Sequence, residues 1–289
     1  MPKISEDPVV PYWRLVDGRA EIYVGDCVRV MKDWSPNVNL LFADPPFNIS
    51  HPYDVYKDNK AKQVYLNWTR EWVAACKRVL SSTGSFWVAI GNYIQADVKK
   101  ILDEAGLYWR DTIAWVYTFG PHQRGKFTPS WVALHYYTMH PTKYVWNQEA
   151  IKVPSARQLK YNDKRAKAGG KTPDNVWILD PSQYPEDCYR EDDNAWLESR
   201  VCGTFKERTE HCAQMPVSVL DRIIKVSSNE GNLVCDPFLG SGTSMESALQ
   251  NNRKCWGVEL SENYVKNICI PRINSLVDPF ATEHMDVST

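Results

Sequence analysis

Residues Leu40–Ser50 read LLFADPPFNIS, an apolar run that ends at an aspartate followed by two prolines, a phenylalanine and an asparagine. The run predicts a buried strand over 38–43 that carries Asp44 into a loop. Proline holds its own φ at about −65° and disfavours helical geometry in the residue before it, so Asp44 and Pro45 are both restrained to extended backbone. Fixed oxygen acceptors beside the ring of Phe47 suit a flat heterocycle that carries an amino group.

A second loop, DPFLGSGTS at 236–244, lies between a predicted strand and a predicted helix. Glycines let a ligand approach the backbone, and a helix N-terminus presents free N–H groups. A Walker-type phosphate loop requires a lysine that is absent here, and a dinucleotide fingerprint requires a third glycine where Met245 stands. The third interpretation is S-adenosylmethionine, which has no phosphate. Glu259, at the end of the next predicted strand, can accept hydrogen bonds from two ribose hydroxyls.

The two loops together resemble the motifs of the DNA amino-methyltransferases, which methylate adenine N6 or cytosine N4. DPPF resembles their catalytic motif and DPFLGSGTS their cofactor motif. Because the catalytic motif comes first, the order is similar to that of the beta group, a circular permutation of the common methyltransferase fold. In this family Asp-Pro-Pro goes mostly with adenine and Ser-Pro-Pro with cytosine, so the resemblance implies an adenine-N6 enzyme. Cytosine N4, RNA and protein amides are the alternative substrates.

The resemblance also assigns roles to residues. The implied catalytic residues are Asp44, Pro45, Pro46 and Phe47, with the first two holding the amino group and Phe47 stacking on a flipped base. The implied cofactor residues are Asp26, Cys27, Asp44, Gln214, Asp236, Pro237, Phe238, Gly240, Ser241, Gly242, Thr243 and Glu259. The stretch around Gln214 departs from the family pattern, because Cys212 stands where proline is usual.

Strands and helices alternate on both sides of an irregular segment, which predicts an α/β fold. With the resemblance, we expect a doubly wound, mostly parallel, Rossmann-like methyltransferase sheet, circularly permuted, with an inserted target-recognition module. The expected parts are an arm (1–18), a catalytic half (19–118), the recognition insertion (119–205), a cofactor-binding half (206–276) and a tail (277–289). Strands are predicted at 20–24, 38–43, 85–90, 112–117, 232–235 and 254–258, with strand-like pieces at 131–139, 144–146 and 176–179. Helices are predicted at 28–34, 68–80, 94–105, 217–226, 244–250 and 262–273, with a helix stop at 81–84 and a mobile loop at 48–66.

The inserted segment contains a basic stretch, KVPSARQLKYNDKRAKAGGK at 152–171, in which Asp163 is the only acid. Basic and polar side chains with a Gly-Gly step suit contacts to phosphates and some contacts to base edges. A second basic polar patch begins the insertion. The candidate DNA-binding residues are His122, Arg124, Lys126, Arg157, Lys160, Tyr161, Lys164 and Arg165.

The composition fits an ordinary globular protein of 289 residues, with 43% hydrophobic and 24% charged residues. The net charge of −1 argues against a protein that coats nucleic acid without specificity. Eight scattered cysteines without metal-ligand spacing predict reduced thiols and no metal site. Without an apolar span or a signal-peptide core, we expect a cytoplasmic protein that binds no membrane. The family resemblance implies that it binds double-stranded DNA. The family resemblance adds two expected partners, a cognate restriction endonuclease and a second copy in a homodimer.

Overall fold

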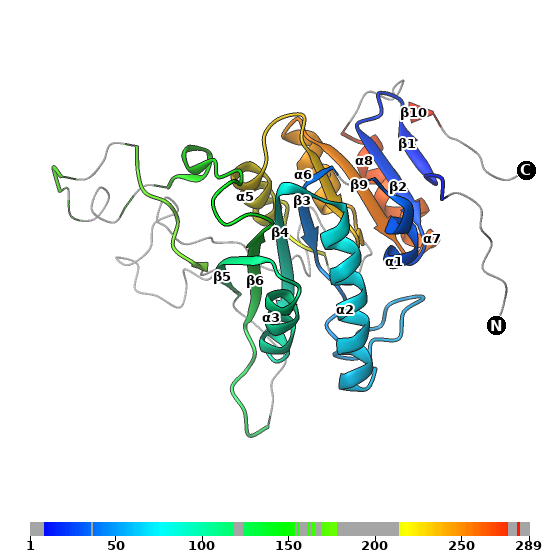
Figure 1. Ribbon diagram of the computed structural model, residues 1–289, viewed down its shortest axis with the longest axis horizontal. Coiled ribbons are helices and arrows are strands. Elements are labelled where there is room, and N and C mark those ends of the chain that lie inside the picture. The colour runs from blue at the N-terminus through cyan, green and yellow to red at the C-terminus, as the bar shows by residue number, and fades with distance from the viewer. Residues whose placement is uncertain are drawn as a thin grey trace, which may run out of the picture.

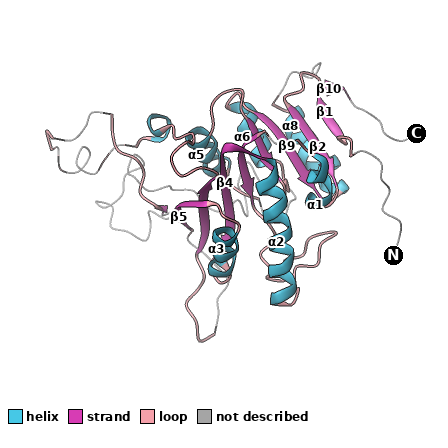
Figure 2. Ribbon diagram, in the orientation of Figure 1, coloured by secondary structure: helices cyan, strands magenta, loops and turns pink. Residues whose placement is uncertain are grey.

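The computed structural model describes residues 9–35, 37–117, 124–153, 155, 161, 163–165, 169–177, 214–276 and 282–283. They form a twisted ten-stranded sheet with helices on both faces (Figures 1 and 2). The strands are β1 (Trp13–Leu15), β2 (Ala20–Val24), β3 (Val38–Ala43), β4 (Leu80–Gly91), β5 (Tyr108–Val116), β6 (Trp131–Thr138), β7 (Val176–Trp177), β8 (Leu233–Asp236), β9 (Lys254–Glu259) and β10 (Thr282–Glu283). The helices are α1 (Cys27–Val30), α2 (Lys62–Val79), α3 (Gln95–Glu104), α5 (Val217–Ser227), α6 (Thr243–Gln250), α7 (Glu262–Tyr264) and α8 (Ile270–Asn274). Three further helical turns are η1 (Met31–Asp33), η2 (Gln148–Ile151) and the π-helical η4 (Val265–Cys269).

The strand order is β10-β1-β2-β9-β8-β3-β4-β6-β5-β7. The central strands β2, β9, β8, β3 and β4 pair in parallel, whereas β6 runs antiparallel between β4 and β5. The predicted α/β class with a mostly parallel sheet is therefore confirmed. β3 pairs directly with β8, through Leu40 with Val234 and Leu41 with Cys235. The loops that follow these two strands therefore start side by side, although nearly 200 residues separate them (236 − 44 = 192).

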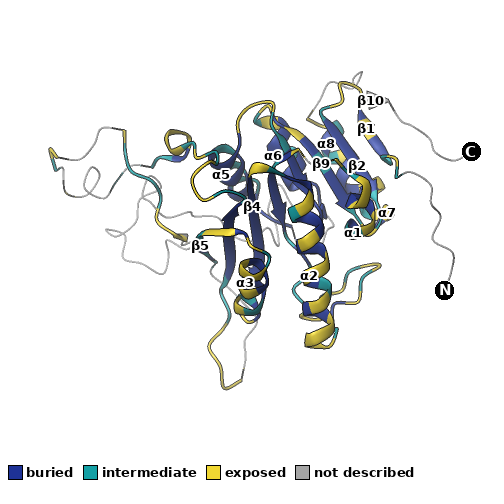
Figure 3. Cartoon of the chain, in the orientation of Figure 1, coloured by how far each residue is buried: buried dark blue, intermediate teal, exposed yellow. Residues whose placement is uncertain are grey.

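Alternation along β3 sends its side chains into two apolar cores, one on each face of the sheet. Leu40 and Phe42 pack with residues of α5, α6 and α8, whereas Leu41 and Ala43 pack with residues of α1, α2 and α3. A strand buried on both faces reads as a nearly continuous apolar run, which is the pattern visible in the sequence. Figure 3 shows the resulting buried sheet between helices whose outer faces are exposed. Since helices cover both faces, ligands have access at the strand ends.

Several predicted elements occur with different ends. The strands predicted at 20–24 and 38–43 are confirmed with the same bounds by β2 and β3. Helix α2 begins at Lys62 rather than at residue 68, because its N-terminus has no capping side chain that a sequence pattern could reveal. β4 begins at Leu80, so residues 81–84, predicted to stop the helix, lie in a strand.

Other predictions need correction. The predicted strand at 131–139 is β6, and it pairs along its length with β4 and β5, so it belongs to the main sheet and not to a separate module. Residues 144–146 form no strand. Residues 13–15, in the predicted arm, form β1. The helix predicted over 262–273 is interrupted by the π-helical turn η4. The division of the chain into catalytic, recognition and cofactor segments stays a prediction.

Candidate active site

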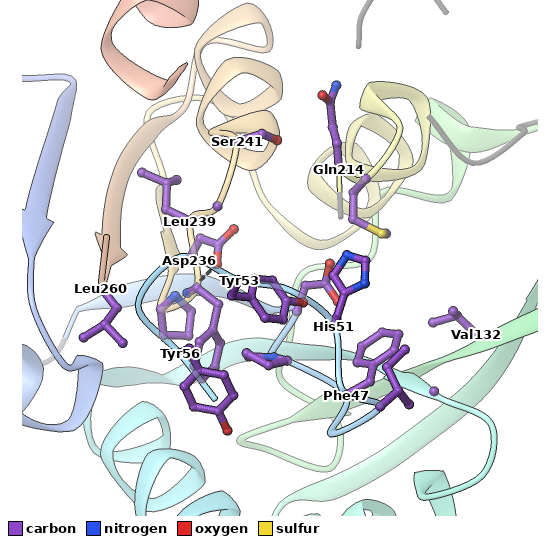
Figure 4. Close-up of a pocket in the computed structure, with 18 of the residues that line it drawn as sticks. Phe47, His51, Tyr53, Tyr56, Val132, Gln214, Asp236, Leu239, Ser241 and Leu260 are labelled. Atoms are coloured by element: carbon purple, nitrogen blue, oxygen red, sulfur yellow. Dashed lines mark hydrogen bonds between the residues drawn. The ribbon is translucent and has the colours of Figure 1, made fainter. Parts of the chain in front are cut away.

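A cavity of about 1390 Å³ opens at the carboxyl ends of β3, β4, β8 and β9. Typical small-molecule pockets measure roughly 300–1,000 Å³, so this one has room for two ligands side by side. Figure 4 shows Phe47 and Asp236, from the two halves of the chain, at the same cavity. The predicted site residues that line it are Asp26, Cys27, Asp44, Pro46, Phe47, Lys126, Gln214, Asp236, Pro237, Phe238, Gly240, Ser241, Thr243 and Glu259. Pro45, which is buried, and Gly242 belong to the same loops but do not line the cavity.

The catalytic candidates leave β3 on a short, well-supported loop. Asp44 is the first residue after β3, is partly exposed, and lines the cavity. The hydroxyl of Tyr65, from α2, donates a 2.8 Å hydrogen bond to the Pro46 carbonyl. The ring of Phe47 lies so close to Gly91 that a Cβ atom there would be 3.2 Å from the Phe47 Cδ2 atom. A carboxylate and an aromatic face are thereby held in a fixed relation.

The post-motif loop, residues 48–61, is held by a buried carboxylate, contrary to the predicted mobile loop. Asp58 is 3% exposed, and it accepts hydrogen bonds from the backbone N–H groups of Asn48 at 2.7 Å and of Ile49 and His51 at 3.0 Å. The Asn48 side chain donates to the Lys60 carbonyl at 2.8 Å and accepts from the Lys60 N–H at 2.7 Å. The asparagine of the motif therefore holds the loop closed. Sequence reasoning missed Asp58, because these contacts follow no periodic pattern.

The post-motif loop also places aromatic rings at the cavity, and these were not predicted. Its residues His51, Tyr53 and Tyr56 line the cavity, as Figure 4 shows. The rings of His51 and Tyr53 meet edge to face with centroids 5.2 Å apart. Tyr56 packs against Trp68 of α2 at 5.7 Å, and the Lys60 ammonium lies 4.6 Å from the centre of the Tyr56 ring. The loop is therefore packed against α2 on one side and open to the cavity on the other.

Two acidic residues end the neighbouring strands β8 and β9. The Asp236 carboxylate is 3% exposed; it accepts from the Phe238 N–H at 2.9 Å and from the Ser244 hydroxyl, and burial raises its pKa to about 6. Glu259 accepts from the Gly240 N–H at 2.8 Å and from the Ser261 N–H at 2.9 Å, and burial raises its pKa to about 7. Both acids thus bind backbone N–H groups in or next to the glycine loop, and Glu259 stays at the cavity wall.

The glycine loop is supported from behind by η4 and α8, a contact that the sequence motif does not reveal. The Cys269 thiol donates to the Gly240 carbonyl at 3.0 Å. Gly242 has φ 78°, which glycine adopts readily, and a Cβ there would lie 3.6 Å from Cys269. Arg272 of α8 forms an ion pair with Glu246 of α6. The backbone of the loop is therefore shaped before any ligand arrives.

Asp26 caps the N-terminus of helix α1. Its carboxylate caps α1, accepting from the N–H groups of Val28 at 3.0 Å and Arg29 at 3.1 Å. The neighbouring Gly25 N–H donates to the Glu259 carbonyl at 2.9 Å, which joins the ends of β2 and β9. Asp26 remains exposed and lines the cavity beside the glycine loop.

The candidate DNA-binding residues differ in their position relative to the cavity. Lys126 lines the cavity mouth and Arg124 is exposed nearby in sequence. Tyr161 and Lys164 are exposed, but Arg165 donates two hydrogen bonds of 2.9 Å to Asp163, so its charge is partly neutralised. The remaining candidates, His122, Arg157 and Lys160, lie outside the described residues.

The described residues contain no cluster of metal-binding side chains and no membrane-spanning helix. In that part of the chain no group of three His, Cys, Asp or Glu side chains is placed to hold a metal ion. None of the helices described above is both long and apolar enough to cross a membrane.

Comparisons with known sequences agree on one family. A family model described as DNA methylase, N6_N4_Mtase, matches residues 38–269. The type II methyltransferase M.HpaI of Haemophilus parainfluenzae is 30% identical over 243 residues, which cover 83% of this chain and 70% of that protein. The DNA adenine methyltransferase YhdJ of Escherichia coli strain K12 is 28% identical over 250 residues, which cover 84% of this chain and 79% of that protein.

Solved structures share the fold at low sequence identity. The PvuII DNA methyltransferase, described as cytosine-N4-specific, matches with a TM-score of 0.65 at 15% identity, over 93% of this chain and 89% of that one. The structure described as the M1.HpyAVI–SAM complex matches with a TM-score of 0.59 at 21% identity, over 88% of this chain and 99% of that one.

Proposed function

This chain belongs to the N6/N4 DNA methylase family, and from that premise we propose that it transfers a methyl group from S-adenosylmethionine to the N6 amino group of an adenine in double-stranded DNA. Methylation of DNA by S-adenosylmethionine is the activity of the family. The family includes both adenine-N6 and cytosine-N4 enzymes, so the choice of adenine is part of our proposal. The observation that carries the proposal is the direct pairing of β3 with β8. It puts the Asp44 loop and the glycine loop at one cavity.

The residues at the cavity fit S-adenosylmethionine. Gly240 lines the cavity, and its φ of 53°, like the φ of 78° at Gly242 in the same loop, is a conformation that glycine adopts readily. The carboxylate of Glu259 suits ribose hydroxyls, and the aromatic ring of Phe238 gives an adenine ring a surface. The residues that would hold the cofactor are Asp26, Cys27, Asp44, Gln214, Asp236, Pro237, Phe238, Gly240, Ser241, Gly242, Thr243 and Glu259. When bound, it supplies an electrophilic methyl group on a sulfonium.

The chain's own residues position the amine. The Asp44 carboxylate and the Pro45 carbonyl accept the two N–H bonds of the exocyclic amino group, which increases electron density on the nitrogen and directs its lone pair. Phe47 stacks on the target base, which must leave the duplex because its amino group cannot be reached inside the stack. Positioning and electrostatics supply the rate enhancement, and transfer needs no covalent enzyme intermediate.

Two observations bear on the choice of base. Asp44 at the head of the motif and the similarity to a DNA adenine methyltransferase favour adenine. The similarity in fold to a cytosine-N4-specific enzyme makes N4-methylcytosine the second candidate product. The similarity to type II methyltransferases supports a companion restriction endonuclease as a partner, and a homodimer is an additional proposal.

The test uses labelled S-adenosylmethionine, unmethylated genomic DNA and nucleoside analysis of the product. Wild type, Asp44→Ala and the control Glu71→Ala, an exposed acid of α2 away from the cavity, are compared. We expect N6-methyladenine from wild type and control and none from Asp44→Ala, with a wild-type circular dichroism spectrum for Asp44→Ala showing that it is folded. N4-methylcytosine would overturn the choice of adenine. In parallel reactions with RNA or protein as the methyl acceptor, label in either of these with none in DNA would overturn the DNA substrate.

A further inference from the structure

β5 and β6 form a hairpin whose described arm, residues 124–130, extends beyond the edge of the sheet where the cavity opens (Figure 1). Its base is closed by the pairing of Val116 with Trp131 and by a 2.8 Å hydrogen bond from the Tyr117 N–H to the Ser130 carbonyl. β6 starts opposite the last residue of β4, since Val132 pairs with Gly91. The hairpin therefore leaves the sheet at the same edge as the Asp44 loop.

The described arm of this hairpin, residues 124–130, exposes a phenylalanine. Phe127 is 99% exposed, more than any other large apolar side chain that the structure describes. It lies at the cavity mouth with Lys126 beside it, and Arg124 is exposed three residues earlier. Neither cation makes an ion pair with a described residue.

This combination fits one kind of partner. An apolar ring left wholly in water is unfavourable unless another surface covers it. The cations Arg124 and Lys126 would be stabilised by an anionic surface, and the ring of Phe127 would be stabilised by an apolar environment. Duplex DNA offers both, with phosphates outside and stacked bases between which apolar side chains can insert.

We propose that Phe127 enters the base stack at the position that the target base leaves, while Arg124 and Lys126 contact flanking phosphates. The inference rests on the proposed function, because only an enzyme that acts on a paired base has to open the pair. Phe47 has the complementary role, because it is half-buried against Gly91 inside the cavity, where it receives the flipped base. One phenylalanine fills the space in the duplex, and the other holds the base that has left it.

The test compares two duplexes that contain the motif found by sequencing DNA methylated by the wild type. In one the target base is paired, and in the other it faces an abasic site, so that little unpairing is needed. For Phe127→Ala we expect kcat/KM to fall at least about tenfold on the paired duplex. The reason is that insertion of the Phe127 ring no longer compensates the free-energy cost of unpairing the target base. On the abasic duplex we expect wild-type activity. Phe127→Trp retains activity on both, as does the control Tyr108→Ala, an exposed aromatic at the opposite end of β5.

A second readout follows the flipped base directly. With 2-aminopurine at the target position, Phe127→Ala should lose most of the fluorescence increase that the wild type produces. Lys126→Ala and Arg124→Ala should each lower the slope of log Kd against log salt by about one. Equal losses on both duplexes, or no loss on either, would overturn the insertion of Phe127 and leave methyl transfer intact. A wild type that methylates no DNA, so that sequencing finds no methylated motif, would overturn the proposed function itself.

Discussion

The hydroxyl of Ser261 donates a hydrogen bond to the carboxylate of Asp54, which lies 207 positions earlier in the chain. Ser261 also accepts from the Tyr264 N–H at 3.1 Å, capping α7, and its own N–H donates to Glu259 at 2.9 Å. A chain of three hydrogen-bonded residues therefore connects the post-motif loop to the acid that holds the glycine loop. The loop that covers the catalytic side is linked in this way to the proposed cofactor side.

Removing this link should loosen the post-motif loop without unfolding the protein. For Asp54→Ala we expect faster hydrogen exchange at amides 49–57 and a loss of about 1 kcal/mol in unfolding free energy, the usual net value of one hydrogen bond. Ser261→Ala should cost about 1 kcal/mol more, because it also removes the α7 cap. Exchange by mass spectrometry measures the first effect and urea unfolding the second. Unchanged exchange in Asp54→Ala would mean that the bond does not restrain the loop.

Asp58→Ala should be more damaging than Asp54→Ala, although both remove one carboxylate from the same loop. Asp58 is buried and accepts three backbone N–H bonds, whereas Asp54 accepts the Ser261 bond at the loop tip. Unsatisfied donors near the motif would cost roughly 1–3 kcal/mol and displace Asn48. We expect initial rates of methyl transfer to fall further in Asp58→Ala than in Asp54→Ala. Equal rates in the two variants would contradict this ranking.

Two glycine substitutions should separate the halves of the site. In Gly91→Ala the new Cβ would be 3.2 Å from the Phe47 ring, which is partly exposed and can shift. We expect lower kcat/KM for DNA with unchanged cofactor affinity. In Gly257→Ala the Cβ would be 2.7 Å from both Cδ atoms of Leu239, a buried residue of the glycine loop. Overpacking there should cost roughly 1–3 kcal/mol of stability and weaken cofactor binding. Calorimetry measures cofactor affinity and steady-state kinetics measures kcat/KM for both variants. Weaker cofactor binding in Gly91→Ala with unchanged cofactor binding in Gly257→Ala would contradict the prediction.

The raised pKa of Asp236 predicts a pH dependence of stability. The folded carboxyl has a pKa of about 6, whereas an unfolded aspartate titrates at about 3.9. Between these values the folded protein keeps a proton that the unfolded chain releases, so raising the pH from about 4 to about 6 destabilises the wild type through this group. Asp236→Asn lacks this contribution. We therefore expect the melting temperature of wild type minus that of Asp236→Asn to fall across this window and stay level above it. Parallel curves in circular dichroism melts from pH 4 to 8 would show that Asp236 does not titrate as inferred.

The central strands and the two functional loops could be predicted from local sequence. β3 is buried on both faces, so its nearly continuous apolar run marks it, and the proline pair marks its end. The glycine loop is equally local, because positive φ values at Gly240 and Gly242 favour that residue type in place. Both features depend on residues that are adjacent in the sequence, and the resemblance to the family rests on these two motifs.

Features that depend on long-range contacts became visible only in the folded chain. β6 joined the main sheet because its hydrogen-bonding partners are β4 and β5, which no pattern within 131–139 specifies. Asp58 and Ser261 are ordinary polar residues in the sequence, and each gained its role from the groups that folding brought within hydrogen-bond distance. Nothing in the sequence distinguishes Phe127 from other apolar residues, whereas the structure shows that it is exposed at the cavity mouth. The physical reason is the same in each case: a periodic pattern records which face of an element is buried, whereas a single contact between distant residues exists only once the sheet has assembled.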